Sequence, residues 1–349
     1  MTEKEIARRD KGNMRKLLAG FPAQVEDAVH IGKRAKLPID ARRIRNIVMT
    51  GLGGSAIGGD LLRSYLSEEL SIPFAVNRHY FLPDFVDRSS LVVVSSYSGN
   101  TEETIAAHMD AAKRKAKVLC ISSNGETERF AKKFGHPFVK IPTGYPPRAA
   151  LGYSFFPLLV VLARLRLVQT RDSDIRETIG LLAKKSALYA ILSAKKNRAL
   201  AIAQQLYNKL PIVYSPAERF DAVNLRWRGQ FCENAKMLAF GHVLPEMNHN
   251  ELVGWKVLRR HMREMAVVFL RDKKMHPRVA VRMEITKSVV SEFTDTVVEA
   301  ESEGKSLLAR MFSLVYLGDW VSYYLAIMNG VDPKPVKVID YLKSELSKV

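Results

Sequence analysis

Short apolar runs alternate with amphipathic helical patterns along the first half of the chain. Apolar positions near helical spacing predict helix in residues 1–45, and the later apolar runs predict strands. These predicted strands lie at residues 46–49, 74–76, 91–95, 118–121 and 138–141. Apolar strands that alternate with helices are typical of a parallel sheet with helices on both faces. We therefore expect a doubly wound α/β fold.

The second half of the chain repeats this outline. A helical pattern covers residues 149–206, with a charged break at 171–174. Predicted strands at 211–214, 265–270 and 296–299 then alternate with predicted helices at 221–236, 281–293 and 305–328. We expect two doubly wound domains with mainly parallel sheets. Residues 1–165 would hold an N-terminal helix and the first domain, and residues 166–349 the linking helices and the second.

A glycine-rich turn follows the first predicted strand, at the sheet edge where ligands bind in such folds. It reads Gly51-Leu52-Gly53-Gly54-Ser55, and its glycines let the backbone approach a ligand closely. The spacing also resembles a dinucleotide fingerprint. However, the second strand ends at Asn77-Arg78, without the acid that would bind an adenosine ribose. A nicotinamide cofactor is therefore disfavoured.

The turn after the third predicted strand is rich in hydroxyl groups. It runs Ser95-Ser96-Tyr97-Ser98-Gly99-Asn100-Thr101 and opens a helix. Unpaired N–H groups and the positive end of the dipole at a helix start suit an anion, and the hydroxyls add donors. Because the loop contains no lysine, a small phosphate ester is a better prediction than a nucleotide. An ordinary helix cap followed by Glu102 and Glu103 remains the alternative.

Composition and charge narrow the possible classes of function. Hydrophobic residues make up 47% of the 349 positions, which is ample for buried cores, and two cysteines are too few for a disulfide framework. The most apolar segment, residues 307–328, contains Arg310 and Asp319, which are costly in lipid, and the N-terminus is polar. We therefore expect a cytoplasmic protein that makes no membrane contact.

The net charge of +18 indicates a basic surface. A nucleic-acid interface would gather these charges and interleave them with exposed aromatic residues, but here the lysines and arginines are spread out. We expect a surface that attracts anionic substrates and binds no nucleic acid.

Two residues of the second half can carry protons. Glu233 lies late on a predicted helix, and His249 lies in the polar loop just downstream. A carboxylate and an imidazole both suit proton transfer. The alternatives are that Glu233 pairs with Arg226 or Lys236 on a solvated face, and that His249 has no role. A single histidine between glutamates is not a metal-ligand spacing, so no metal is expected.

Together these motifs resemble the bifunctional phosphoglucose/phosphomannose isomerase family, built from two sugar-isomerase (SIS) domains. The motifs that carry the resemblance are, in chain order, Gly51-Leu-Gly-Gly-Ser55, Ser96-Tyr-Ser-Gly-Asn-Thr101-Glu-Glu-Thr104, Pro147-Arg148, Glu233-Asn-Ala-Lys236 and Pro245-Glu-Met-Asn-His249-Asn-Glu251. The hydroxyl loop alone indicates only a SIS domain, whereas the last two motifs are much more specific. Phe231-Cys232 and Met247 depart from the family pattern but remove no proton carrier.

The resemblance implies an aldose–ketose isomerase that needs no cofactor. It would interconvert glucose 6-phosphate, and also mannose 6-phosphate, with fructose 6-phosphate through a cis-enediolate. The residues that would hold the substrate are Ser96, Ser98 and Thr101 at the phosphate and Gly53, Gly54 and Ser55 at the sugar end.

The family also implies which residues would do the chemistry. Glu233 would be the base, and Arg148 would stabilise the charge of the intermediate. His249 would assist ring opening from the neighbouring subunit of a homodimer. A C-terminal lysine would complete the site, with Lys343 the better match and Lys337 the poorer one.

Three rival functions use the same kind of domain. A sugar-phosphate-binding regulator without catalysis would normally carry a DNA-binding helix-turn-helix, for which residues 1–45 offer no convincing candidate. An isomerase of arabinose or heptose phosphates would have no reason to carry the Glu233 and His249 motifs. A glucosamine synthase would carry an N-terminal cysteine and a glutaminase domain, which are not expected here.

Overall fold

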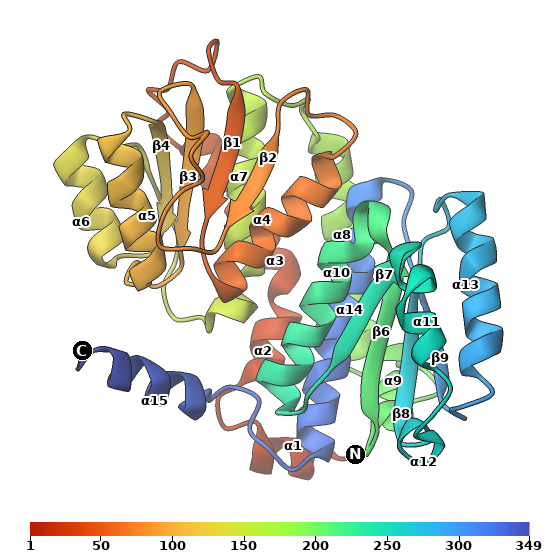
Figure 1. Cartoon of the computed structure of the whole chain (residues 1–349). Helices are drawn as coiled ribbons and strands as arrows, with labels where there is room; N and C mark the ends of the chain where they lie inside the picture. Colours follow the sequence, from red (N-terminus) through yellow and green to blue (C-terminus); the bar gives the residue numbers. More distant parts are fainter. Residues whose placement is uncertain (349) are drawn as a thin grey trace. The chain divides into compact units, whose positions relative to one another are not determined.

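The computed structural model describes residues 1–348, which form two compact units (Figure 1). The first unit comprises Gly20–Leu181 with Lys305–Ala309, and the second comprises Met1–Ala19, Leu182–Gly304 and the chain from Arg310 onwards. This division differs from the expected boundary at residue 165. It falls inside helix α8 (Asp172–Tyr189), and it assigns the first 19 residues to the second unit.

Two long-range hydrogen bonds tie the N-terminal segment to the second unit. The Tyr316 hydroxyl donates to the Leu18 carbonyl at 2.8 Å, and the Arg15 guanidinium donates to the Ala190 carbonyl at 2.9 Å. Both bonds join positions far apart in the sequence. No local sequence pattern could indicate them.

The first unit is built on a five-stranded parallel sheet of order β2-β1-β3-β4-β5. The strands are β1 (Asn46–Thr50), β2 (Phe74–Asn77), β3 (Ser90–Ser96), β4 (Lys117–Ser122) and β5 (Phe138–Lys140). Every residue of β3 is buried, as expected for the central strand of a sheet covered on both faces. All five predicted strands are confirmed.

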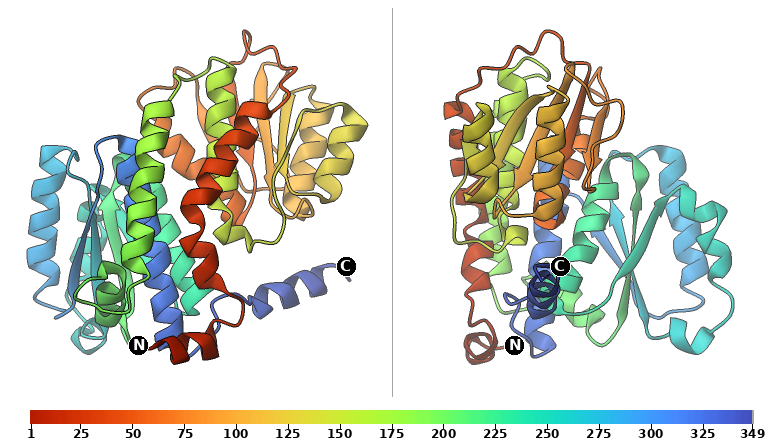
Figure 2. Two further views of the ribbon diagram at one scale, coloured as in Figure 1. Left: turned by 180° about the vertical axis from the view of Figure 1, so that it is seen from behind. Right: turned by 60° about the vertical axis from the view of Figure 1, so that its left-hand side comes forward.

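Helices cover both faces of this sheet (Figure 2). They are α3 (Phe21–Arg34), α4 (Gly53–Leu66), α5 (Glu102–Lys113), α6 (Gly125–Phe134) and α7 (Leu151–Arg164). The first part of α8 belongs to the same unit. Helix α7 packs against both α3 and α4. Residues 35–45 form no helix, contrary to the prediction for this end of the N-terminal segment. Pro38 lacks an N–H group and disfavours helical geometry at Leu37.

The second unit holds a four-stranded parallel sheet of order β7-β6-β8-β9. The strands are β6 (Leu210–Pro216), β7 (Phe240–Leu244), β8 (Met265–Arg271) and β9 (Val297–Glu301). Three of them were predicted, and β7 was missed. It is an edge strand with mostly exposed or half-buried residues, and Gly241 and His242 interrupt its apolar pattern.

The helices of the second unit are α1 (Glu3–Arg9), α2 (Met14–Ala19), α9 (Arg198–Leu206), α10 (Ala217–Gln230), α11 (Glu251–Gly254), α12 (Arg259–Met262), α13 (Pro277–Val290), α14 (Leu307–Met328, from its fourth residue) and α15 (Lys337–Leu346). Of these, the short α11 and α12 and the terminal α15 were not predicted from the sequence. The architecture expected for the two halves, parallel sheets flanked by helices, is confirmed.

Helix α14 is the one helix of the described chain long and apolar enough to span a membrane by length and composition. Of its apolar window, 94% is buried in the protein. Its two charges are paired inside: Arg310 Nε lies 2.8 Å from Asp272 Oδ1, and Asp319 Oδ2 lies 2.8 Å from Arg226 Nη2. The burial of α14 and the internal pairing of its two charges identify it as a core helix, because a buried charge needs a partner.

Candidate functional site

The polar turns of the first unit lie side by side at the carboxyl edge of its sheet. Thr50, at the end of β1, is in register with Val94 of β3, and Ser96 is in register with Ser122 of β4. The turns that follow these strands lead into α4, α5 and α6. Parallel register therefore gathers the glycine turn, the hydroxyl turn and the Ser122–Gly125 turn, as expected for a ligand-binding edge.

Tyr97 links the three turns. Its backbone N–H donates to Ser55 Oγ at 3.1 Å, which joins the hydroxyl turn to the glycine turn. Its carbonyl accepts from Ser123 Oγ at 2.6 Å and from the Ser123 N–H at 3.2 Å. Its hydroxyl accepts from the Tyr145 N–H at 2.8 Å, and burial raises the pKa of this phenol. This linking role was not predicted, because Tyr97 stands among more obvious donors in the sequence.

Two glycines allow the hydroxyl turn and the Ser122–Gly125 turn to touch. Gly99 has φ +73°, and a Cβ there would lie 1.7 Å from the Asn124 carbonyl oxygen. Gly125 has φ +78°, and a Cβ there would lie 2.4 Å from Asn100 Oδ1. A side chain at either position would clash and would also be strained. The close approach fixes the hydroxyl turn relative to α6.

The three residues predicted to bind the phosphate differ in burial and in their hydrogen bonds. Ser96 is buried; its Oγ accepts from the Gly99 N–H at 3.1 Å and lies 3.0 Å from Thr101 Oγ1. Thr101 is half-buried and is the N-cap of α5, but its side chain makes no capping hydrogen bond. Ser98 is exposed, and its Oγ accepts from the Asn100 N–H at 3.3 Å. The hydroxyls therefore stand at the start of α5, whose N–H groups no capping side chain satisfies.

Arg148 is placed beside the glycine turn by a close backbone contact. It lies in a short 3-10 turn, Pro147–Ala149, and is buried. A Cβ on Gly54 would lie 2.5 Å from the Pro147 carbonyl and 2.8 Å from the Arg148 backbone nitrogen. Only glycine permits this approach of α4 to the turn. The first unit thus brings together Arg148 and all the predicted binding residues: Gly53, Gly54, Ser55, Ser96, Ser98 and Thr101.

Glu233 stands in a π-helical turn, Phe231–Ala235, that continues α10. The helix predicted over residues 221–236 therefore changes its hydrogen-bonding pattern at the expected base, and such turns are frequent at functional sites. Two neighbours hold the turn in place. The buried Asn234 amide donates to Ser322 Oγ at 2.9 Å, and Lys236, at φ +57°, donates to the carbonyls of Glu233 and Pro333. The half-buried Glu233 is thereby fixed at its backbone.

A cleft of about 900 Å³ opens beside Glu233 within the second unit. Its lining includes the basic side chains Arg8, Arg9, Lys11, Lys236 and Lys337. Its size is that of a small-molecule site, and its charge suits an anionic ligand. The basic residues at the N-terminus were missed as candidates. Only the packing of α1 onto this unit brings them to the cleft.

His249 lies at the end of a 3-10 turn, Glu246–His249, and is exposed. The two flanking amides anchor its loop. Asn248 Nδ2 donates to Thr286 Oγ1 at 2.8 Å, and Asn250 Nδ2 donates to Glu246 Oε1 at 2.9 Å. Among the residues that the structure describes, His249 is not part of the lining of the Glu233 cleft.

The two candidate lysines lie on α15. Lys337, the first residue of the helix, lines the Glu233 cleft, whereas Lys343 lies further along and is exposed. The structure thus groups Lys337 with Glu233 and leaves Lys343 and His249 outside that cleft. Glu233 and Arg148 belong to different units.

Comparisons with known proteins give the family. A family model of the bacterial phospho-glucose isomerase C-terminal SIS domain matches residues 195–346, and a model of the SIS domain matches residues 42–132. A bifunctional phosphoglucose/phosphomannose isomerase of Caldicellulosiruptor bescii is 44% identical over 330 residues, which cover 94% of this chain and 97% of the relative. An enzyme of Aquifex aeolicus with the same name is 39% identical over 88% of this chain and 92% of its own length.

Solved structures share the fold at low sequence identity. A glucose-6-phosphate isomerase-like protein of Thermus thermophilus has a TM-score of 0.65 and 20% identity, covering 97% of this chain and 98% of that one. The C-terminal domain of a glucosamine-fructose-6-phosphate aminotransferase of Francisella tularensis has a TM-score of 0.67 and 16% identity, covering 91% and 96%. With the curated relatives and both family models in agreement, the chain belongs to the bifunctional phosphoglucose/phosphomannose isomerase family.

Proposed function

We propose that this protein interconverts glucose 6-phosphate, and also mannose 6-phosphate, with fructose 6-phosphate. The observation that carries the proposal is the 44% identity to a bifunctional isomerase over 94% of the chain. The hydroxyl turn at the start of α5 supports the choice of a phosphate ester, and the basic cleft beside Glu233 supports an anionic substrate.

In the proposed reaction, the Glu233 carboxylate removes the proton from C2 of the open-chain aldose. The electron pair of that C–H bond forms the C1–C2 double bond of a cis-enediolate, and the C1 carbonyl oxygen takes up negative charge. Arg148 stabilises this charge as a fixed cation. Glu233 then returns a proton to C1, and the hydroxyl proton moves from O2 to O1. C1 is reduced and C2 is oxidised within one molecule, so the electrons balance without a cofactor.

The remaining residues would bind the substrate and open its ring. Ser96, Ser98 and Thr101 hold the phosphate, and Gly53, Gly54 and Ser55 form the wall at the sugar end. Of these, Ser55 also accepts from the Tyr97 N–H, so it orders the phosphate turn as well.

We also propose a homodimer in which His249 serves the site of the neighbouring subunit, and to which Lys343 contributes. What supports this is the exposure of His249 outside the Glu233 cleft and the apolar side chains that α15 exposes, among them Tyr341 and Leu342. Exposed apolar surface of this kind is typical of an interaction site.

A coupled assay with fructose 6-phosphate as substrate tests the activity, with glucose 6-phosphate and mannose 6-phosphate scored separately. Glu233→Gln should lower turnover by at least ~10²-fold, because the amide cannot accept the proton. It should still bind fructose 6-phosphate in a calorimetric titration, since the phosphate contacts are unchanged. Near-normal turnover would remove Glu233 from the mechanism. Binding without turnover in the unaltered protein would instead favour a sugar-phosphate-binding regulator.

A further inference from the structure

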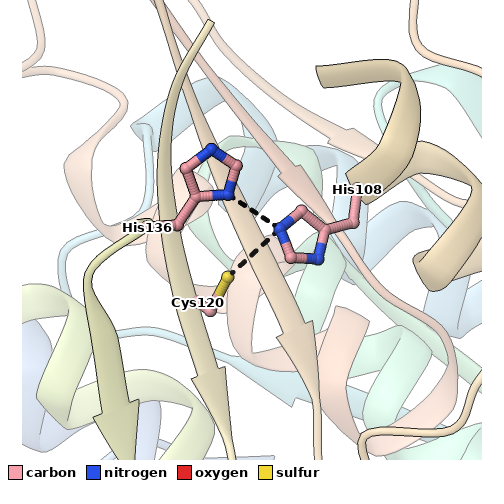
Figure 3. Close-up of side chains that lie close together, drawn as sticks. All are labelled: His108, Cys120 and His136. Carbon is pink, nitrogen blue, oxygen red and sulfur yellow. Dashed lines mark hydrogen bonds between the residues drawn. The ribbon is translucent and has the colours of Figure 1, made fainter. Parts of the chain in front are cut away.

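Three side chains with metal-binding atoms converge in the first unit, away from the residues assigned to the isomerase site. His108 comes from α5, Cys120 from β4, and His136 from the segment between α6 and β5. Figure 3 shows the two imidazoles and the thiol pointing toward one another. Their positions in the sequence, 12 and 28 residues apart from His108, form no recognisable ligand motif, so the sequence predicted no metal.

Two of the three distances within this cluster are close to those around a single cation. His108 Nε2 lies 3.0 Å from His136 Nδ1 and 3.6 Å from Cys120 Sγ, and all three ligand atoms lie within 4.8 Å of one another. Bond lengths of about 2.0–2.1 Å to nitrogen and 2.3 Å to sulfur place tetrahedral ligands of Zn²⁺ roughly 3.3–3.6 Å apart. The two distances from His108 Nε2 therefore differ from those around a bound Zn²⁺ ion by no more than a few tenths of an ångström.

The protein around the cluster is largely apolar. His108 and Cys120 are fully buried and His136 is half-buried, so the cluster lies nearest to solvent at His136. The rings of Phe130 and Phe134 meet the His108 ring edge-on, with centroids 6.2 and 6.0 Å away. Such a shell excludes water from the ligands and strengthens their bonds to a cation.

Among the described residues, one ring nitrogen of His108 has no hydrogen-bond partner. Its Nε2 faces both other ligands, whereas its Nδ1 is buried without a partner among the described residues. If Nδ1 carries the ring hydrogen, the lone pair of Nε2 points to the centre of the cluster.

We propose that His108 Nε2, His136 Nδ1 and Cys120 Sγ bind one Zn²⁺ ion. The thiol loses its proton to solvent on binding, and a water takes the fourth position on the half-exposed side. The site links α5, β4 and the segment before β5, so its role is to stabilise the first unit. It lies outside the turns that would hold the substrate, and it takes no part in isomerisation.

Cobalt provides the test, because Co²⁺ occupies such sites and its thiolate bond gives a charge-transfer band in the near ultraviolet. Chelator-treated, reduced protein is titrated with CoCl₂ and then with ZnCl₂. We expect one saturable equivalent per chain with this band, displacement of cobalt by zinc, and a Tm that rises with zinc concentration. Absence of saturable binding, or a saturated spectrum without the thiolate band, would overturn the proposal.

Matched variants locate the ligands. Cys120→Ser should abolish the charge-transfer band, and His136→Gln should lower zinc affinity at least ~10²-fold, beyond the usual cost of losing a residue that only supports a ligand. Cys232→Ser and His30→Gln change an exposed cysteine and an exposed histidine and should leave both readouts unchanged. If Cys120→Ser does not fold, the half-buried His136 variant decides. Unchanged zinc affinity in His136→Gln would refute the site.

Discussion

At the scale of single residues, the hydroxyls of the turn after β3 have unequal tasks. Ser96 is buried and accepts from a backbone N–H of its own turn, so its loss would disturb the turn itself. Ser98 is exposed, and its substitution should remove a ligand contact while leaving the fold intact. This difference makes Ser98 the cleaner probe of the proposed phosphate site.

Ser98→Ala should raise the KM for fructose 6-phosphate about tenfold or more, since a hydrogen bond to a charged group contributes roughly 1.5–3 kcal/mol. The effect on kcat should be small, because the phosphate is held equally in the ground state and the transition state. Ser71→Ala, at an exposed serine outside the turns, is the control. An unchanged KM in the Ser98 variant would argue against a phosphate contact there.

At the scale of elements, the start of α4 can approach the Pro147–Ala149 turn closely only because Gly54 has no Cβ. Gly54→Ala should push the turn and Arg148 away from the glycine turn, because the new Cβ would lie 2.5 Å from the Pro147 carbonyl. Since a misplacement of about 1 Å can lower turnover by up to ~10²-fold, we expect kcat to fall at least tenfold.

Gly180→Ala is the matched control for that substitution. Gly180 lies on α8, and a Cβ there would meet nothing within 4 Å. Its replacement should keep full activity and stabilise the protein slightly, because alanine favours helix by about 0.5–1 kcal/mol over glycine. Equal kinetics in the two alanine variants would contradict the contact between α4 and Arg148.

Helix α15 presents a second test at this scale. It is a helix without buried residues that exposes apolar side chains, and it carries both candidate lysines. If α15 packs on a partner subunit, Lys343→Ala should lower kcat/KM at least tenfold through loss of a cation near the substrate, and Lys337→Ala should have the smaller effect. The reverse order would assign the role to Lys337, which lines the Glu233 cleft of its own chain.

At the scale of the whole molecule, the proposed homodimer predicts that two inactive variants regain activity when they are mixed. Glu233→Gln and His249→Ala should each be nearly inactive alone. When the two variants are unfolded together and refolded in equal amounts, half of the dimers contain both chains. Each mixed dimer then has one intact Glu233–His249 site, so activity should recover to about a quarter of the wild-type rate. No recovery, with mixed dimers demonstrated by differently tagged chains, would place His249 and Glu233 in the same subunit's site.

Local pattern was sufficient to predict most strands. Uniformly apolar runs such as β3 predict a buried strand without any knowledge of their neighbours, and alternation with helices predicts parallel pairing. The half-exposed β7 was missed because an edge strand needs only one partner and little apolar character. The loop at residues 35–45 was missed because apolar spacing outweighed the effect of Pro38.

The two-sheet architecture, the order of the motifs and the residue types that can bind a phosphate or move a proton follow from the sequence, because they depend on spacing along the chain. Three features could be found only in the folded chain: Tyr97 joins three turns, Glu233 stands on a π-turn beside a basic cleft, and His108, Cys120 and His136 meet. Each of these depends on contacts between residues far apart in the sequence, which parallel sheet register and the packing of helices bring together.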